Sequence, residues 1–369
     1  MKVINISTDR NVFDADSQVC QRMKEYGSIF DELHIIVFSL KKHGYKKTRM
    51  APNVWAYPTN SIWKIGYPLK AFLISRKIYA GTNSEDVVIS TQDPFETGLV
   101  GLLVKITKKI RLNVQIHADM YSPFFVKDSF LNKVRVFIAP YVLKRADNIR
   151  VVSKRISKSL QDRGIDQEKI SVLPIYVDKG GYDNFQDIAR KDSMLLAVSR
   201  LTSEKNLFFL IDVINDVVDK KPDVQLVVVG DGPLKDELSL YVARRKLEQH
   251  IKFVGWKNNV AKYYKQSGLF VHTSMYEGYG MVFIEAALQY VPIVSSDVGI
   301  MGDVFIHNKS AQVCPVGDKE CFVKYIIEML EDTQKSQQIS DVAYKSVTEH
   351  LPYSKEQYLA KYKEAVCGY

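Results

Sequence analysis

Two glutamates, Glu277 and Glu285, occupy a segment in which an unpaired carboxylate would be costly. In EGYGMVFIEAAL (277 to 288), every residue from Met281 to Leu288 except Glu285 is apolar. A helix of this composition is expected to be buried on nearly every side, where an unpaired carboxylate pays a large desolvation cost. The hydroxyls of a bound ribose would satisfy Glu285. The alternatives are a basic partner on a neighbouring helix and a position at a thinly covered edge of the protein.

The expected start of this helix near Gly280 would leave backbone N–H groups free. These groups and the positive end of the helix dipole suit a phosphate. Helical side chains lean toward the N-terminus of their helix, so Glu277 and Glu285 are expected to face one cavity.

Two cations, Arg200 and Lys205, lie in VSRLTSEKN (198 to 206), directly after an expected strand. A guanidinium and an ammonium group on a strand-to-helix turn suit a diphosphate. Surface salt bridging is the alternative for both side chains.

Two further turns follow apolar strands. In VVVGDGPLKDEL (227 to 238), Gly230 and Gly232 precede Pro233 and would permit close backbone approach to a ligand. Lys235 replaces the third glycine of a dinucleotide fingerprint, so an NAD site is disfavoured. The other turn, FVGW (253 to 256), is uninformative by itself.

The elements that must position these residues alternate between short β-branched runs and longer helical patterns, such as 66 to 80 and 129 to 145. This alternation predicts two doubly wound α/β domains, whose ligands bind beyond the carboxyl ends of the strands. The expected domains are 1–178 and 193–351 with a polar linker at 179–192, and a terminal helix at 352–369 either returns to the first domain or closes the second. The expected strands are VINIS, HIIVF, VVIS, VQIHA, IRVVS, MLLAVS, VQLVVVG, IKFVG, LFVHTS and VPIVSS.

The composition indicates a globular protein. The chain has 369 residues, 46% of them hydrophobic, which suffices for two domains. It has no apolar run of the roughly 18 residues needed to span a membrane and no signal-peptide pattern, so a cytoplasmic location is expected. The four cysteines lack CxxC spacing, which predicts reduced thiols rather than disulfides or a zinc site.

The positive charge is concentrated in the first half. Residues 1 to 190 hold 30 Lys and Arg against 19 Asp and Glu, whereas the remainder holds 21 against 23. Basic runs at 41 to 49 and 105 to 111 could attract anionic lipid, glycan or nucleic acid, or simply form a solvated face. The segment 61 to 77 mixes aromatic, apolar and basic residues, which suits an anionic membrane surface and a lipid-linked sugar.

The chain resembles the retaining glycosyltransferases of the GT-B fold, of the large family 4 type. The resemblance is carried by Arg200 and Lys205, GDGP (230 to 233), VGW (254 to 256) and the E-x7-E pair of Glu277 and Glu285. It implies two Rossmann-like domains facing a central cleft. The N-terminal domain would bind the acceptor and the C-terminal domain the nucleotide sugar.

The resemblance also implies roles for individual residues. Arg200 and Lys205 would neutralise the donor diphosphate, and Glu285 would hold the ribose. Glu277 would grip the donor sugar with the 278–282 backbone. The donor would be a nucleotide-diphosphate sugar such as a UDP- or GDP-hexose, with no cofactor and no metal. The expected donor-binding backbone and pocket residues are Gly230, Gly232, Pro233, Gly255, Trp256, Gly278, Tyr279, Gly280, Met281 and Val282.

In the first domain, VQIHADMYSP (114 to 123) places His117 and Asp119 after a strand. Many relatives have a histidine here that touches the donor sugar, so His117 is an expected site residue. The loop after the first strand lacks the Gly-Gly pair of many relatives. The acceptor-side candidates are Asp16, Ser17, Arg22 and Asp119.

The expected function is transfer of a hexose to an acceptor hydroxyl with retention of configuration, in cell-surface polysaccharide or glycolipid assembly. The acceptor would be a glycan or a lipid-linked sugar, and the protein could lie on the inner face of the membrane. A sugar-nucleotide epimerase, a phosphorylase, a glycosyltransferase acting on nucleic acid and a non-catalytic sugar-nucleotide-binding protein remain alternatives. No known nucleic-acid-binding motif is present.

Overall fold

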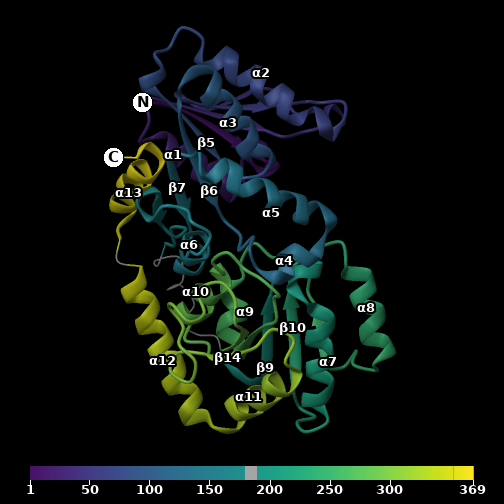
Figure 1. The fold of residues 1–369 in the computed structure, drawn as a ribbon. Helices are drawn as coiled ribbons and strands as arrows, with labels where there is room; N and C mark the ends of the chain where they lie inside the picture. The colour runs from purple at the N-terminus through teal and green to yellow at the C-terminus, as the bar shows by residue number, and fades with distance from the viewer. Residues whose placement is uncertain (179–188, 352, 369) are drawn as a thin grey trace. The chain divides into compact units, whose positions relative to one another are not determined.

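The computed structural model describes residues 1–178, 189–351 and 353–368, which divide into two compact units. The first unit comprises Met1–Tyr121, Ser129–Pro174 and the chain from Tyr353 onward, and the second comprises Ser122–Asp128 and the described residues between Ile175 and Leu351. Both chain ends therefore belong to the first unit (Figure 1). Residues 179–188 of the predicted linker lie outside the described residues.

The first unit is built on an eight-stranded sheet, parallel except at one edge. The strand order is β3-β4-β2-β1-β5-β6-β7-β8, and only β3 pairs antiparallel with its neighbour. The inner strands are buried along nearly their whole length, because helices cover both faces of a doubly wound sheet. The strands are β1 (Lys2–Ser7), β2 (Glu32–Val37), β3 (Thr48–Ala51), β4 (Val54–Pro58), β5 (Val87–Thr91), β6 (Arg111–Ile116), β7 (Asn148–Val151) and β8 (Ile170–Val172).

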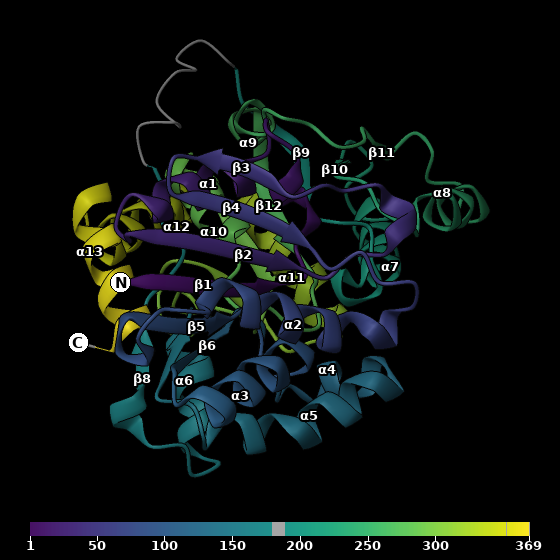
Figure 2. The same cartoon turned by 90° about the horizontal axis from the view of Figure 1, so that it is seen from above.

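Three helices of the first unit, α2, α3 and α5, lie side by side along one face of the sheet (Figure 2). The C-terminal helix α13 packs against strands of the same sheet. The Asn148 side-chain amide donates to the Val366 carbonyl oxygen (2.8 Å), and the rings of Tyr26 and Tyr362 stack at 3.9 Å. The helices are α1 (Gln18–Gly27), α2 (Tyr67–Tyr79), α3 (Glu96–Lys108), α5 (Phe130–Leu143), α6 (Lys154–Gln161) and α13 (Lys355–Cys367).

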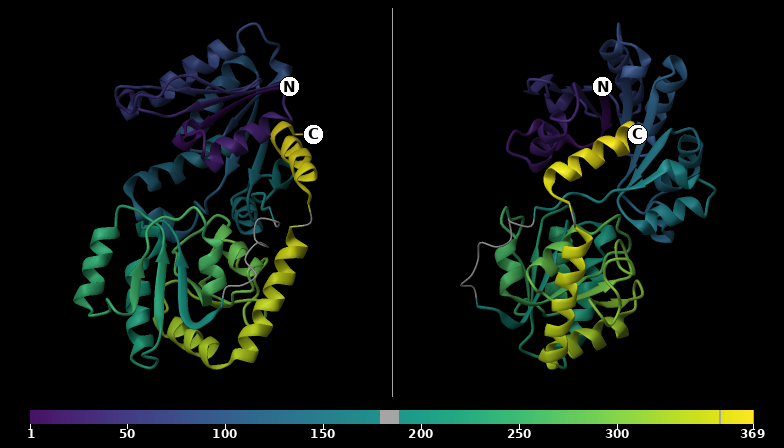
Figure 3. Two further views of the ribbon diagram at one scale, coloured as in Figure 1. Left: turned by 180° about the vertical axis from the view of Figure 1, so that it is seen from behind. Right: turned by 90° about the vertical axis from the view of Figure 1, so that its left-hand side faces the viewer.

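The second unit is built on a six-stranded parallel sheet in the order β11-β10-β9-β12-β13-β14. Its core consists of aliphatic residues from these strands and from the helices packed on them, and α12 runs along this unit (Figure 3). The strands are β9 (Lys191–Val198), β10 (Gln225–Val229), β11 (Ile251–Phe253), β12 (Ser267–His272), β13 (Ile293–Ser296) and β14 (Gln312–Cys314). The helices are α4 (Pro123–Asp128), α7 (Leu207–Val218), α8 (Lys235–Arg244), α9 (Ala261–Gln266), α10 (Met281–Leu288), α11 (Lys319–Glu331) and α12 (Thr333–His350).

The predicted fold class is confirmed, since both units are doubly wound α/β sheets of Rossmann-like type. Each of the ten predicted strands is present, as are helices at 66 to 80 and 129 to 145. The prediction missed β3, β4, β8 and β14, which have three to five residues each. Such short strands at or near the sheet edges carry little periodic signal. Among the described residues, no helix has the length and apolarity required to span a bilayer.

One short segment lies in a different unit from the one predicted. Ser122–Asp128, expected in the domain 1–178, groups with the second unit. The Ser203 hydroxyl donates to Asp128 Oδ1 (3.1 Å), and the ring of Phe125 meets that of Tyr276 edge to face at 5.4 Å. The later boundary falls after Pro174 rather than after Asp178, and β9 begins at Lys191, inside the predicted linker 179–192.

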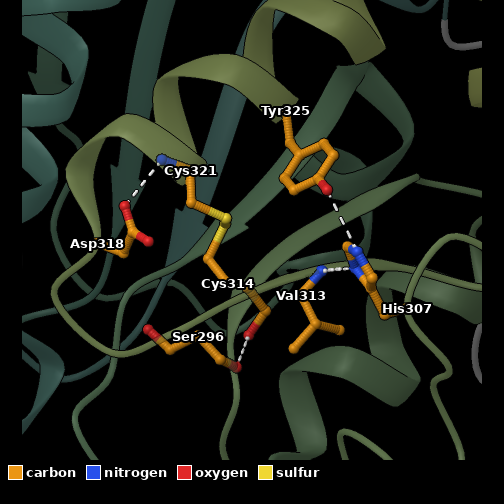
Figure 4. Close-up of a disulfide and its surroundings, with 8 residues drawn as sticks. Ser296, His307, Val313, Cys314, Asp318, Cys321 and Tyr325 are labelled. Atoms are coloured by element: carbon orange, nitrogen blue, oxygen red, sulfur yellow. Dashed lines mark hydrogen bonds between the residues drawn. A yellow bond between two sulfur atoms is a disulfide. The ribbon is translucent and has the colours of Figure 1, made fainter.

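The predicted reduced state is wrong for two of the four cysteines. Cys314 and Cys321 form a disulfide (Figure 4). Cys314 ends β14, and a turn then leads into α11, where Asp318 accepts a hydrogen bond from the Cys321 backbone N–H (3.0 Å). This turn brings the two Cα atoms to 5.8 Å, within the range that a disulfide requires. Sequence spacing alone did not reveal the reversal of the chain.

The disulfide gives an expected thiol count. Cys20 and Cys367 are free and buried. Alkylation of the denatured protein without reductant should therefore modify two cysteines, and alkylation after reduction should modify four. Intact-mass spectrometry measures both numbers. Four modified cysteines without reductant would show that Cys314 and Cys321 are thiols in solution.

Candidate active site

The sheet topology of the second unit places the Lys205 turn beside the Glu277 turn. Strand β9 precedes Lys205 and strand β12 precedes Glu277, and these two strands are parallel neighbours although about 70 residues separate them along the chain. The strand order reverses at this pair, because β10 follows on one side and β13 on the other. A crevice opens at such a switch point, beyond the carboxyl ends of the strands.

The Glu277 carboxylate is held through one of its two oxygens. Oε1 accepts hydrogen bonds from Lys205 Nζ (2.5 Å), the Ser274 hydroxyl (2.9 Å) and His272 Nε2 (3.0 Å). Among the described residues, no group donates to Oε2. The carboxylate is thus oriented by protein groups at Oε1 and has free acceptor capacity at Oε2.

The protonation states of this cluster follow from burial and charge. Burial opposes ionisation of Glu277, but the hydrogen bond from His272 and the charge of Lys205 outweigh it and lower the pKa of Glu277 to about 2. Burial lowers the pKa of His272 despite the neighbouring carboxylate, so the imidazole is neutral at pH 7 and donates through Nε2–H. Lys205 and Glu277 therefore form an ion pair whose side chains are 12% and 14% exposed.

Hydrogen bonds to the backbone fix the two turns against each other. The Met275 N–H donates to the Glu204 carbonyl oxygen (2.8 Å), and the Thr273 hydroxyl donates to that of Lys205 (3.1 Å). Asn206 adopts a left-handed conformation (φ 55°), which asparagine tolerates better than most residues, and α7 starts directly after it. Lys205 is thus held on a rigid turn rather than on a free loop.

Arg200 lies in a different environment from Lys205. Its side chain is 76% exposed and pairs with Glu204 four residues later (3.0 Å). This contact corresponds to the salt bridge named above as the alternative. A role for Arg200 at a diphosphate remains a prediction, and exchange of Glu204 for a phosphate would be required.

Glu285 lies in the second turn of α10 and is hydrogen-bonded to a neutral group. The Tyr264 hydroxyl, from α9, donates to Glu285 Oε2 (3.0 Å). Burial raises the pKa of Glu285, and this hydrogen bond offsets only part of the shift. Among the described residues no cation pairs with Glu285, which removes the alternative of a basic partner on a neighbouring helix.

The start of α10 is suited to an anion. Gly280 precedes the helix with φ 90°, and a Cβ at this position would lie 2.4 Å from the Phe283 ring, so only glycine fits. No side chain caps the helix, and Met281 and Val282 form its first turn with their N–H groups uncapped. Gly278 and Tyr279 are buried, so a ligand could reach them mainly through the backbone.

Gly230 and Gly232 contact a neighbouring turn. A Cβ on Gly230 would lie 1.8 Å from the Ser199 carbonyl oxygen, and one on Gly232 would lie 2.5 Å from that of Leu201. These glycines therefore let the turns after β9 and β10 approach each other closely. Pro233 is exposed. Ligand contacts at Gly230, Gly232 and Pro233 remain predictions.

The turn after β11 is open. Gly255 has φ 73° with free space around it, and Trp256 is 67% exposed. An exposed indole beside an open glycine could stack on a nucleotide base. Contacts of Gly255 and Trp256 with a nucleotide base remain a prediction.

The first unit has a small pocket at its own switch point. This pocket of about 140 Å³ lies at the carboxyl ends of β1, β5 and β6, and its lining includes Thr8, Asp93 and His117. Desolvation and then the positive charges of Arg150 and Arg22 lower the pKa of the His117 imidazole. A neutral imidazole can both donate to and accept from a hydroxyl.

The other acceptor-side candidates differ in availability. The Ser17 side chain caps α1 by accepting from the Cys20 N–H (3.0 Å), and its hydroxyl lies within hydrogen-bond distance of two carbonyl oxygens. Ser17 is therefore engaged in local structure. Asp16 is exposed, whereas Arg22 and Asp119 are half-buried. Contacts of these four residues with an acceptor remain predictions.

Several residues of these sites were missed in the sequence. They are Ser274 and His272 around Glu277, Tyr264 beside Glu285, and Asp93 in the first-unit pocket, where burial raises the pKa of the Asp93 carboxyl. An imidazole inside the apolar strand LFVHTS was a usable signal for His272. Tyr264 had no such signal. Among the described residues, no group of three or more His, Cys, Asp or Glu side chains is placed to hold a metal ion.

The sequence of the second unit matches a known family. Residues 181–346 match the model described as Glycosyl transferases group 1. A 4-alpha-N-acetylgalactosaminyltransferase from Campylobacter jejuni, which acts on N-acetylgalactosamine-N,N'-diacetylbacillosaminyl-diphospho-undecaprenol, is 31% identical over 179 residues, 48% of each chain. The chain thus spans about half the length of this relative. An N-acetyl-alpha-D-glucosaminyl L-malate synthase from Bacillus anthracis is 21% identical over 345 residues, 90% of this chain and 88% of the relative.

Solved structures share the whole fold. HepE from Anabaena, in complex with UDP and glucose, superposes with a TM-score of 0.78 at 18% identity and full coverage of both chains. A sucrose-phosphate synthase from Thermosynechococcus elongatus reaches 0.82 at 16% identity, covering 99% of this chain and 98% of that one. This likeness confirms the predicted GT-B fold class.

Proposed function

Residues 181–346 carry a domain of the glycosyl transferases group 1 family, and from this premise we propose that the chain transfers a hexose from a nucleotide-diphosphate sugar to an acceptor hydroxyl. The observation that carries the proposal is the cluster at the β9–β12 switch point. It combines a buried ammonium, an oriented carboxylate with one free oxygen and the position that parallel sheets use for ligands.

The proposed donor diphosphate binds to Lys205 and to the uncapped N-terminus of α10. Both supply positive charge. Their attraction to the diphosphate becomes stronger as the bond between sugar and phosphate breaks, because the leaving diphosphate gains negative charge. Arg200 joins this site when a phosphate replaces Glu204 as its partner. The nucleotide ribose binds Glu285, whose Oε1 accepts no hydrogen bond from the described residues.

Glu277 is proposed to bind the donor sugar. Its Oε2 would accept hydrogen bonds from sugar hydroxyls, while Oε1 stays bound to Lys205, Ser274 and His272. We propose retention of configuration through attack on the face from which the diphosphate departs. A donor phosphate oxygen takes the proton of the acceptor hydroxyl, so no separate protein base is needed.

The first unit is proposed to bind the acceptor. The pocket containing His117 and Asp93 lies at the β1–β5 switch point, where the imidazole and the carboxyl group can orient hydroxyls. The C. jejuni relative is named for a lipid-linked acceptor and the B. anthracis relative for L-malate. We propose a glycan or lipid-linked glycan acceptor and a role in cell-surface polysaccharide or glycolipid assembly.

A nucleotide-sugar panel tests this function. The protein is incubated with UDP-, GDP- and ADP-hexoses, and slow donor hydrolysis and the shift in Tm are measured. One nucleotide sugar should raise the Tm and release its nucleoside diphosphate. Absence of both effects across the panel would contradict the proposal. Conversion of the donor to its epimer, or release only with phosphate, would identify an epimerase or a phosphorylase instead.

Substitution of Glu285 should weaken nucleotide binding. Glu285→Gln removes the charge-assisted hydrogen bonds to the ribose hydroxyls, and the Kd for the nucleoside diphosphate should rise about tenfold or more. Isothermal titration calorimetry measures this change. Glu248→Gln, at an exposed position in the same unit, is the matched control. An unchanged Kd for Glu285→Gln would remove the ribose role from Glu285.

A further inference from the structure

Three neighbouring helices of the first unit expose many apolar side chains. We call the outer surface of α2, α3 and α5, with the loop 62–65 that leads into α2, the α2–α3–α5 face. Of the nineteen exposed large hydrophobic residues in the described chain, twelve lie here, so the exposure is concentrated rather than scattered. They are Ile62, Trp63, Ile65, Leu69, Leu73, Leu103, Ile106, Phe130, Leu131, Val134, Phe137 and Tyr141.

Helix α5 is apolar on both of its sides. Its inner side, including Ala139, Val142 and Leu143, is buried. Its outer side carries Phe130, Val134, Phe137 and Tyr141 at the spacing of a helical stripe, with Phe130 79% and Phe137 86% exposed. A stripe of this kind normally packs against another element, and the described chain supplies none.

The loop before α2 projects apolar side chains beside a basic loop. Ile62, Trp63 and Ile65 are 74%, 73% and 90% exposed. The Lys41 N–H donates to the Ser61 carbonyl oxygen (2.9 Å), and Leu40 and Ser61 form a parallel bridge. These bonds fix the loop 62–65 next to the lysine-rich segment 41–47, four of whose seven residues are lysines.

The charge on the same helices is almost entirely positive. Together α2, α3 and α5 contain seven Lys and Arg residues and a single acid, Glu96. Glu96 is already paired with Arg135, whose Nε donates to both carboxylate oxygens (3.0 and 3.1 Å). Lys105 is paired with Asp147 outside these helices (2.6 Å). The other lysines of these helices and of the loop before α2 make no ion pair with the described residues; they are Lys64, Lys70, Lys77, Lys108 and Lys133.

We propose that the α2–α3–α5 face docks the protein on an anionic lipid bilayer. Trp63, Ile65 and Phe137 enter the headgroup region, and the surrounding lysines contact lipid phosphates. Charge complementarity selects this occupant, since a second copy of the chain would oppose two cationic surfaces. Nucleic acid would match the cations but not the exposed aliphatic residues. The docking is peripheral and stands independently of the proposed glycosyl transfer.

The test is sedimentation with vesicles of phosphatidylcholine, with or without phosphatidylglycerol. The protein should sediment with the anionic vesicles and remain in solution with the neutral ones. Raising the salt concentration from about 0.1 M to about 1 M should release a large part of it, because the screening length falls from about 10 Å to about 3 Å. Light scattering on the protein without vesicles should give the mass of a monomer.

Two variants separate the apolar and the electrostatic contributions. Lys70→Glu/Lys77→Glu and Trp63→Ser/Phe137→Ser should each lower the partition onto anionic vesicles at least about tenfold. Lys220→Glu/Lys252→Glu and Leu240→Ser make matched changes at exposed positions of the second unit and should leave partition unchanged. An unchanged Tm and unchanged nucleotide affinity show that every variant is folded.

Three results would overturn the proposal. The first is no sedimentation of the wild-type protein with anionic vesicles at low salt. The second is an equal loss of partition in the second-unit controls. The third is a dimer that Trp63→Ser/Phe137→Ser converts to a monomer while vesicle binding is absent, which would assign the face to a second copy of the chain. Failure of vesicle binding leaves the nucleotide-sugar panel unaffected, so the two proposals fail separately.

Discussion

Replacing Lys205 with alanine is expected to lower the turnover of the donor about 100-fold or more. The Lys205 ammonium is 12% exposed and lies at the β9–β12 switch point, where its charge is poorly screened. Its stabilisation of the leaving diphosphate grows in the transition state, so the loss should appear in kcat rather than in KM alone. Steady-state kinetics with the nucleotide sugar found by the panel measures both constants.

Two controls accompany this variant. Lys205→Arg keeps the charge but changes its shape and should recover part of the activity. Lys220→Ala, at an exposed position of the same unit, should leave both constants unchanged. A value of kcat near that of the wild type for Lys205→Ala would remove Lys205 from the proposed chemistry.

Glu277→Ala is expected to abolish most activity and also to destabilise the second unit by about 3 kcal/mol. Without the carboxylate, the Lys205 ammonium is left in a largely buried position without its ion-pair partner. Lys205→Ala/Glu277→Ala should therefore be more stable than Glu277→Ala, although it remains inactive. Denaturant unfolding of the wild type, the two single variants and the double variant gives this coupling free energy. Additive losses of stability would show that the pair is not coupled.

The same carboxylate predicts a direction for the pH dependence. The pKa of Glu277 is lowered from 4.5 to about 2 in the folded state. A lowered pKa means that the stabilisation is present above about pH 4.5 and is lost as the pH falls toward 2. The difference in unfolding free energy between the wild type and Glu277→Gln should be constant from pH 7 to about 5 and shrink below it. A difference that grows on acidification would contradict the ion pair.

The sequence contained enough information to predict the fold and the proximity of Lys205 and Glu277, but not the residues that surround them. Parallel strands buried on both faces appear as continuous β-branched runs, which is why VVIS and LFVHTS were recognised. Glu277 and Lys205 follow such strands, and the switch-point rule anticipates their meeting. The structure brings Lys205 and Glu277 together and pairs Arg200 with Glu204, and the roles of these residues at a donor remain predictions.

What could not be predicted depends on contacts between distant segments. Tyr264 reaches Glu285 from a different helix, and no local pattern of the sequence pairs these residues. The Cys314–Cys321 disulfide requires a turn between β14 and α11 that brings the Cα atoms to 5.8 Å. Helix α5 carries apolar residues on both of its sides, so its sequence pattern does not reveal which side is covered. Only the structure shows that the side with Phe130 and Phe137 is exposed.

The most direct test of the central claim is a crystal structure of the protein with a bound nucleoside diphosphate, UDP or GDP. The expected result has the phosphates within hydrogen-bonding distance of Lys205 Nζ and of the first N–H groups of α10, with the ribose hydroxyls on Glu285. A nucleotide bound elsewhere on the second unit, with Lys205 and Glu285 both out of contact, would contradict the account.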